Sequence, residues 1–176
     1  MSLFPTTDAY NVSLNSSTVV NDAPGYCRKK WFTPSGYTNQ VWQDQVRAIN
    51  KTGGTLVVGG LYILSESNTA GEEWQIVTAA ALASVPRTIC VATTATLNNA
   101  FGDVVIRGHA SALVEGTTDV AAADRLKLAP GTFADAFIKD SAETVSSAGK
   151  SCAAQADNSK VLTLVILHGK DVVVNT

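Results

Sequence analysis

Residues that could carry catalysis are few in this chain, and their spacing matches no complete motif. Ala148-Gly149-Lys150-Ser151 ends like a phosphate-binding loop, but the first glycine of that motif would fall on Thr144. Ser147 and Lys150 have the spacing of a serine–lysine acylase, yet its partner motifs SDN and KTG are absent from the sequence. We therefore expect no phosphate cradle and no activated serine at this point of the chain.

The histidines and carboxylates also lack the spacing that acid–base catalysis or metal binding requires. The two histidines, His109 and His168, have no neighbours at the spacing of a triad or a metal site. Several acidic residues could pair, but they lack the every-second-residue spacing of a calcium loop: Asp119, Asp124, Asp135, Asp140 and Glu143. We expect a protein that is not an enzyme and that has no metal and no cofactor.

The cysteine count and the length of the apolar runs limit the cellular setting. Cys27, Cys90 and Cys152 are odd in number and widely spaced, which favours buried free thiols in a reducing compartment. The first residues, MSLFPTTDAYNVS, lack the basic and apolar regions of a signal peptide. No apolar stretch approaches a membrane span, so we expect no membrane partner.

Composition favours a β-rich protein whose surface is covered by other protein. The chain has 176 residues, of which 45% are hydrophobic and only 16% charged, whereas about a quarter of an average chain is charged. Thr, Ser, Asn, Ala and Gly take the place of charged residues, which suits β-surfaces and subunit contacts. The net charge of −2 argues against nucleic acid as the main partner.

One cluster combines basic and aromatic residues. Arg28-Lys29-Lys30 lies between Tyr26 and the pair Trp31-Phe32, and Trp42 follows shortly afterwards. Such a cluster could stack on nucleic acid bases, but three charges without further support favour a protein partner, because Trp, Tyr and Arg dominate protein-binding hot spots. We predict that Tyr26, Trp31, Phe32 and Trp42 contact a partner protein or a neighbouring subunit.

The chain divides by pattern into residues 1–50 and residues 51–176. The first part is rich in turn formers and shows no sustained periodicity, apart from a possible short helix over 39–49. It nevertheless holds seven of the twelve aromatics, which is unlike a disordered linker. We interpret it as an extended arm that packs on its own domain or on another chain.

Short strands with frequent turns dominate residues 51–176, which predicts a small β-barrel or β-sandwich with little helix. Residues 72–85 are open between helix and strand, with a preference for a strand followed by an Ala-rich connection. Alternation over 103–115 predicts that Glu115 faces solvent together with Arg107, His109 and Ser111. The predicted strands are 53–64, 87–93, 103–115, 125–128, 160–167 and 172–174.

An ordered series of elements resembles the head decoration (cement) proteins of tailed bacteriophages, of the small β-barrel type. It covers about residues 88–169, and Ala123 departs from the glycine usual before the Asp. The matching elements are a glycine-bounded strand (102–108), a second strand (110–114), a Gly-Thr turn (116–118), a Val-to-Leu step (120–126), Gly131, an Ala-rich strand (149–156), a turn (157–159) and an apolar strand (161–167).

This resemblance implies a structural virion protein on the outer surface of a phage capsid, made in the bacterial cytoplasm. It would bridge adjacent major capsid proteins, often as a homotrimer, and would have no active site. A second possibility is a β-rich module of a virion appendage that binds host glycans, for which Tyr62 and Trp74 could serve. An enzyme of unrecognised type is the third and least favoured class.

Overall fold

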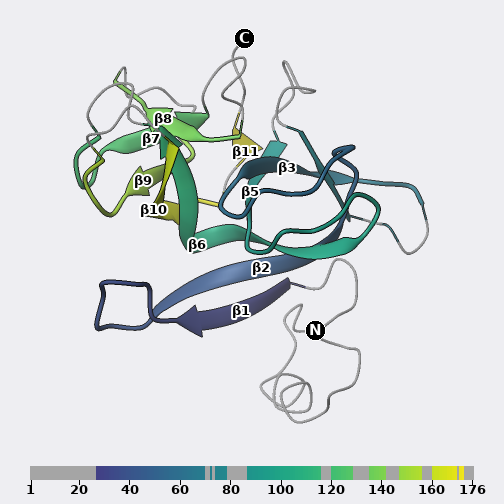
Figure 1. Cartoon of the computed structure of the whole chain (residues 1–176), viewed down its shortest axis with the longest axis horizontal. Helices are drawn as coiled ribbons and strands as arrows, with labels where there is room; N and C mark the ends of the chain where they lie inside the picture. The colour runs from purple at the N-terminus through teal and green to yellow at the C-terminus, as the bar shows by residue number, and fades with distance from the viewer. Residues whose placement is uncertain are drawn as a thin grey trace, which may run out of the picture.

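The computed structural model describes residues 27–69, 72, 74–78, 87–115, 120–128, 135–141, 147–155, 160–169 and 171–172. These residues form strands joined by turns, with no helix among them (Figure 1). The expected fold class, a β-barrel with little helix, is confirmed. The strands are β1 (Cys27–Phe32), β2 (Val41–Asn50), β3 (Leu61–Glu66), β4 (Trp74–Val77), β5 (Arg87–Ala92), β6 (Phe101–Glu115), β7 (Arg125–Leu128), β8 (Phe137–Lys139), β9 (Gly149–Ser151), β10 (Lys160–Leu167) and β11 (Asp171–Val172).

Strand pairing closes a five-stranded barrel, which we call the first barrel. Its order is β2-β4-β3-β5-β6, and β6 returns to pair with β2. Because side chains alternate along a strand, the even-numbered residues of these strands fill the interior. This interior core comprises Val46, Ala48, Leu56, Tyr62, Leu64, Ile76, Cys90, Ala92 and Val104.

Strand β6 is the element that joins the first barrel to the rest of the fold. It is 15 residues long and changes partners near Gly108, which has a φ of +84°. Before Gly108 it pairs with β2 and β5, and from Gly108 onward it pairs with β10. A second ring then runs β6-β10-β9-β7-β8 and closes where Val114 pairs with Phe137.

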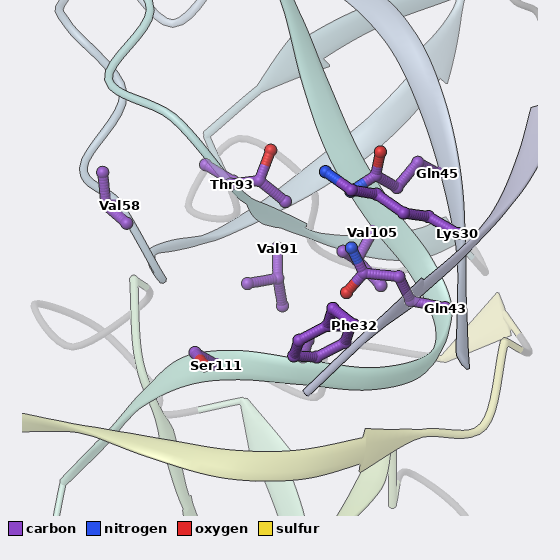
Figure 2. A pocket seen from close by; sticks show the side chains of 11 residues that line it. Lys30, Phe32, Gln43, Gln45, Val58, Val91, Thr93, Val105 and Ser111 are labelled. Atoms are coloured by element: carbon purple, nitrogen blue, oxygen red, sulfur yellow. The ribbon is translucent and has the colours of Figure 1, made fainter. Parts of the chain in front are cut away.

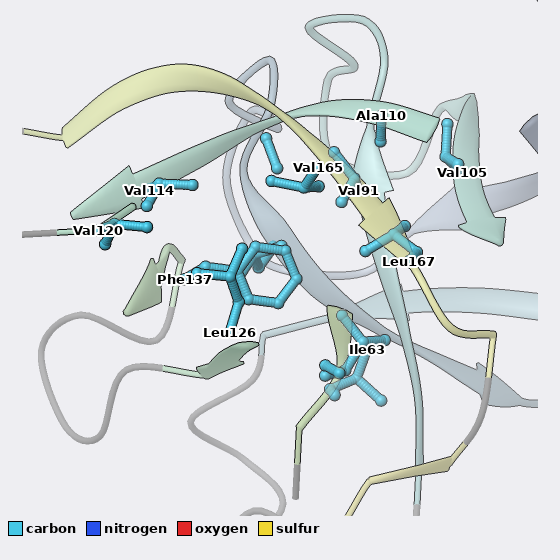
Figure 3. Packing of buried hydrophobic residues seen from close by; sticks show 14 residues of the cluster. Ile63, Val91, Val105, Ala110, Val114, Val120, Leu126, Phe137, Val165 and Leu167 are labelled. Atoms are coloured by element: carbon cyan, nitrogen blue, oxygen red, sulfur yellow. The ribbon is translucent and has the colours of Figure 1, made fainter. Parts of the chain in front are cut away.

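A second apolar core lies between the two rings. The outer faces of β3 and β5 supply Ile63 and Val91, while the second ring supplies Leu126, Phe137 and Val165 (Figure 3). Strands β3 and β5 are therefore buried on both faces, which explains why their sequences are nearly continuous apolar runs. The second ring has no separate core, since its apolar side chains pack on the outside of the first barrel.

Residues 27–50 form a hairpin whose second strand, β2, belongs to the first barrel, so this stretch is not part of the extended arm predicted over 1–50. The turn between β1 and β2 is closed by a hydrogen bond from the Tyr37 amide to the Pro34 carbonyl, 3.1 Å long. The predicted helix over 39–49 is the strand β2, which pairs with β1, β4 and β6. Buried Gln43 and Gln45 conceal its strand periodicity, because these polar side chains are buried on the face of β2 that points away from the barrel interior. Residues 1–26 lie outside the described residues.

Most other strand predictions are confirmed. The predicted strand 53–64 is an exception, because only 61–66 form β3 and residues 53–60 form turns and irregular backbone. Trp74–Val77 is a strand, as preferred, whereas the Ala-rich connection after it lies outside the described residues. Glu115 was expected to face solvent, but it is buried at the end of β6 where the second ring closes. The last predicted strand is seen only as β11, since residues 173–176 are not described.

Candidate interaction site on the first hairpin

The hairpin of β1 and β2 carries three of the four predicted interface residues. Trp31 lies directly opposite Trp42 in the antiparallel register, and Phe32 lies opposite Val41. Alternation along β1 therefore places Trp31 and Phe32 on opposite faces of the hairpin. The structure thus brings the two tryptophans together and separates Phe32 from them. Tyr26 lies outside the described residues.

One face, which we call the tryptophan face, combines exposed aromatic surface with two cations. Trp31 is 57% exposed, although it is one of the largest apolar side chains in the chain. The Lys29 ammonium lies 4.8 Å from the ring centroid of Trp42, and the Arg107 guanidinium lies 5.4 Å from it. Both distances fall within the range of cation–π attraction, so Trp42 is held between strands β1 and β6.

Gly108 makes the position of Trp42 possible. A Cβ atom at residue 108 would come within 2.6 Å of the Trp42 carbonyl oxygen and 2.8 Å of its ring. The φ of +84° is also a conformation that side chains with a Cβ rarely adopt. Strand β6 bends where it passes from the first barrel to the second ring (Figure 1). This bend and the position of Trp42 therefore depend on the same glycine.

The opposite face of the hairpin, which we call the pocket face, carries Arg28, Lys30 and Phe32. Arg28 donates to an Asp103 carboxylate oxygen over 2.5 Å and, through Nε, to the Gln45 side-chain oxygen over 3.2 Å. This cation therefore ties β1 to β6 and is not available to a partner. Lys30 and Phe32 instead line a pocket of about 220 Å³ (Figure 2).

The three carboxylates singled out in the sequence that the structure describes, Asp124, Asp135 and Asp140, are paired with lysines. Asp124 also accepts a 2.7 Å hydrogen bond from the Ala121 amide. The Lys139 ammonium and that amide hold the pKa of the Asp124 carboxyl below its usual range. Asp119 and Glu143 lie outside the described residues. The lysine contacts are Asp124–Lys139 at 2.8 Å, Asp135–Lys160 at 2.5 Å and Asp140–Lys127 at 3.7 Å.

Neither partial catalytic motif has the structure its chemistry needs. Residues 149–151 form strand β9 and not a loop leading into a helix, so no phosphate-binding turn exists there. Ser147 is buried, and its hydroxyl donates to the Gly149 carbonyl over 3.3 Å. His109 is half-buried on β6, where its Nδ1 has no hydrogen-bond partner among the described residues. The described residues also hold no group of three His, Cys, Asp or Glu arranged around a metal position.

All three cysteines are free, but only Cys90 is buried, so the expectation of three buried thiols is wrong for the other two. Burial raises the pKa of the Cys90 thiol, which packs inside the first barrel. Cys27 is exposed on the tryptophan face. Although the residue is exposed, partial burial of its sulfur and the nearby Asp44 carboxylate raise the pKa of the Cys27 thiol.

The residues considered for glycan binding serve the fold. Tyr62 is buried in the first barrel, and its hydroxyl accepts a 2.8 Å hydrogen bond from the Val57 amide. Trp74 packs against the same core from β4. Neither ring is presented as an open platform on which a sugar could stack.

Comparison of the chain with models of known protein families and with curated proteins gave no match. Within the described parts of the chain, no helix is long and apolar enough to cross a membrane. The candidate site therefore depends on geometry alone. Sequence reasoning found Trp31 and Trp42 but missed Arg107 and the pocket, because these come from β5 and β6, which are distant in sequence.

Proposed function

We propose that this chain is a structural virion protein that binds the outer surface of a phage capsid and bridges adjacent major capsid proteins. In this proposal it works as a homotrimer, without catalysis, cofactor, nucleic acid or membrane. The tryptophan face, with Trp31 exposed beside Trp42, is the observation that carries the proposal. Exposed tryptophans flanked by cations are the residue types that dominate protein-binding hot spots.

Other exposed apolar side chains support a broad contact with protein. Leu162 and Ile166 project from the outer face of β10, with exposures of 52% and 37%. Val57 and Val58, in the turn before β3, are also exposed, and Gly59 packs directly against Leu162. These side chains add apolar area next to a surface that is poor in charge, which suits a protein held by many weak contacts.

The β-barrel fold also supports the proposal, because it is the fold that the resemblance to decoration proteins implies. The segments that carry this resemblance fall on β6, β7, β9 and β10, which are the strands of the second ring apart from β8. This agreement adds weight to the proposal at the level of fold only.

Cosedimentation with expanded phage heads that lack their decoration protein tests the proposal. We expect saturable binding of the wild-type chain at a fixed ratio to the major capsid protein, together with greater resistance of the heads to heat. Trp31→Ala should weaken this binding by at least about tenfold, the effect typical of a hot-spot residue.

Leu97→Ala is the matched control, because Leu97 is 68% exposed but lies in the turn between β5 and β6, next to the Asn50 end of β2 and not to the end that carries Trp42. This variant should bind like the wild type. If the chain stays in the supernatant at micromolar concentration, the capsid proposal is wrong and glycan binding becomes the next function to test.

A further inference from the structure

The pocket on the pocket face lies in the bend of β6. Val105 lines it from before the bend, and Ala110 and Ser111 line it from after the bend. Strands β1 and β2 form one side through Lys30, Gln43 and Gln45, and β5 and the turn before β3 form the other (Figure 2). The pocket thus exists only because the hairpin packs across the junction of the two rings.

Its size fits one amino-acid residue. The volume of about 220 Å³ exceeds that of an apolar cavity that holds benzene, about 150 Å³. It is smaller than the pockets of drug-sized ligands and cofactors, which are about 300–1,000 Å³. The pocket is therefore suited to a single side chain with its backbone, and not to a nucleotide or a flavin.

The walls are mainly apolar. Phe32, Val58, Val91, Val105 and Ala110 all line the pocket, and Figure 2 shows the Phe32 ring near Val91. An aliphatic side chain placed among them would lose its contact with water, which is the main favourable contribution to binding in such a site.

Lys30 supplies charge complementarity toward an anion. Among the residues that the structure describes, it is the one charged residue in the lining, and none of them brings a carboxylate into the pocket. Its side chain is exposed and makes no hydrogen bond or ion pair with the described residues. The neighbouring cation Arg28 is already bound to Asp103, so Lys30 is the ammonium available to a ligand carboxylate.

Gln43 adds a group suited to a peptide unit. It is only 6% exposed, lines the pocket and makes no side-chain hydrogen bond within the described part of the chain. Its carboxamide both donates and accepts, as the N–H and C=O groups of a peptide require. Gln45, in contrast, already accepts from Arg28.

Strand β1 leaves room for an extended polypeptide beside the pocket. Among the described strands it pairs only with β2, so its other edge has backbone groups that are not used in the sheet. A partner chain that approaches along this edge would reach the pocket next to Lys30.

We propose that this pocket binds the C-terminal residue of a partner polypeptide. The aliphatic side chain of that residue lies among Phe32, Val91 and Val105, its carboxylate pairs with the Lys30 ammonium, and its peptide group bonds to the Gln43 amide. The inference does not depend on the capsid proposal, because it uses the opposite face of the hairpin.

N-acetyl-leucine is the probe, because it carries an isobutyl side chain, a free carboxylate and one peptide group. Titration into the ¹⁵N-labelled full chain should give saturable shifts of the Gln43 side-chain amide, with a dissociation constant on the order of 1 mM. N-acetyl-leucinamide lacks the charge and 4-methylpentanoate lacks the peptide group, so each should bind at least about fivefold more weakly.

Three substitutions complete the test. Lys30→Met should weaken binding of N-acetyl-leucine by about fivefold or more. Lys29→Met, which changes the adjacent lysine on the tryptophan face, should leave the affinity unchanged. Ser111→Leu should block the pocket from an exposed position on β6 that does not belong to either core.

Absence of shifts at 20 mM probe would overturn the proposal, as would equal weakening by Lys29→Met and Lys30→Met. If 4-methylpentanoate binds as tightly as N-acetyl-leucine, the pocket recognises a carboxylate alone and not the end of a polypeptide. This result would also count against the proposal. None of these results bears on cosedimentation with phage heads, so the two proposals fail separately.

Discussion

The two faces of the β1–β2 hairpin differ in how they use the same kinds of residue. On the tryptophan face, the Trp31 ring is exposed, and cations from β1 and β6 lie against the half-buried Trp42 ring. On the pocket face, an aromatic ring and a cation turn toward the bend of β6 and leave a space of residue size. Strand alternation therefore turns one basic and aromatic segment into an open contact surface and a small recess.

This difference is the basis for proposing two separate kinds of binding by the hairpin. A broad surface with an exposed tryptophan suits a large protein partner, whose affinity comes from contact area and a few hot spots. A recess lined by the Lys30 ammonium and the Gln43 amide suits a single residue that carries a carboxylate and a peptide group. Both depend on the bend at Gly108, so substitution there tests them together.

Gly108→Ala should have the largest effect, because the added Cβ would lie 2.6 Å from the Trp42 carbonyl oxygen at a φ of +84°. We expect a loss of about 2–4 kcal/mol in the free energy of unfolding and a fall in Tm of roughly 5–15 °C. Thermal unfolding followed by circular dichroism measures both.

Gly54→Ala is the control for Gly108→Ala. A Cβ at residue 54 would meet no atom within 4 Å, so stability should change by less than about 0.5 kcal/mol. Two-dimensional NMR of Gly108→Ala should show shifts on both faces of the hairpin. Shifts limited to the tryptophan face would mean that the bend does not support the pocket.

Alanine substitutions at the two tryptophans should differ in their effect on the free energy of unfolding. Trp42 is half-buried between two cations, so Trp42→Ala should lower the free energy of unfolding by about 1–3 kcal/mol. Trp31→Ala removes a largely exposed ring and should cost less than about 0.5 kcal/mol. Urea denaturation compares the variants, and equal losses would show that both rings are structural.

The smallest effect concerns the reactivity of Cys27 on the tryptophan face. Burial and the Asp44 carboxylate raise the pKa of this thiol, while Lys29 lowers it. Because alkylation requires the thiolate, Asp44→Asn should lower the pKa and speed reaction with iodoacetamide at pH 8 by about twofold, and Lys29→Met should slow it. A Cys152→Ser background isolates the signal, and changes of the same sign in both variants would contradict this electrostatic account.

Much of the fold could be predicted because strand periodicity is a local property. The strands over 103–115, 125–128 and 160–167 alternate or are continuously apolar, and all three are found. Strand β2 was missed because Gln43 and Gln45 are buried polar residues, which removes the contrast between its faces. The turn formers around Pro34 favour an arm when the sequence is taken alone, although they close a hairpin.

The sequence by itself determined the class of structure, since β-propensity and alternation are local properties of the chain. Its aromatic content also led to the prediction of residues that contact protein, which stays a prediction. Only the tertiary structure decided that Trp31 faces Trp42, that Arg107 joins them, and that Lys30 and Phe32 border a recess with Val91 and Ala110. Those relations depend on the register between distant strands and on the bend at Gly108. Both arise from how the two rings close, which no local pattern specifies.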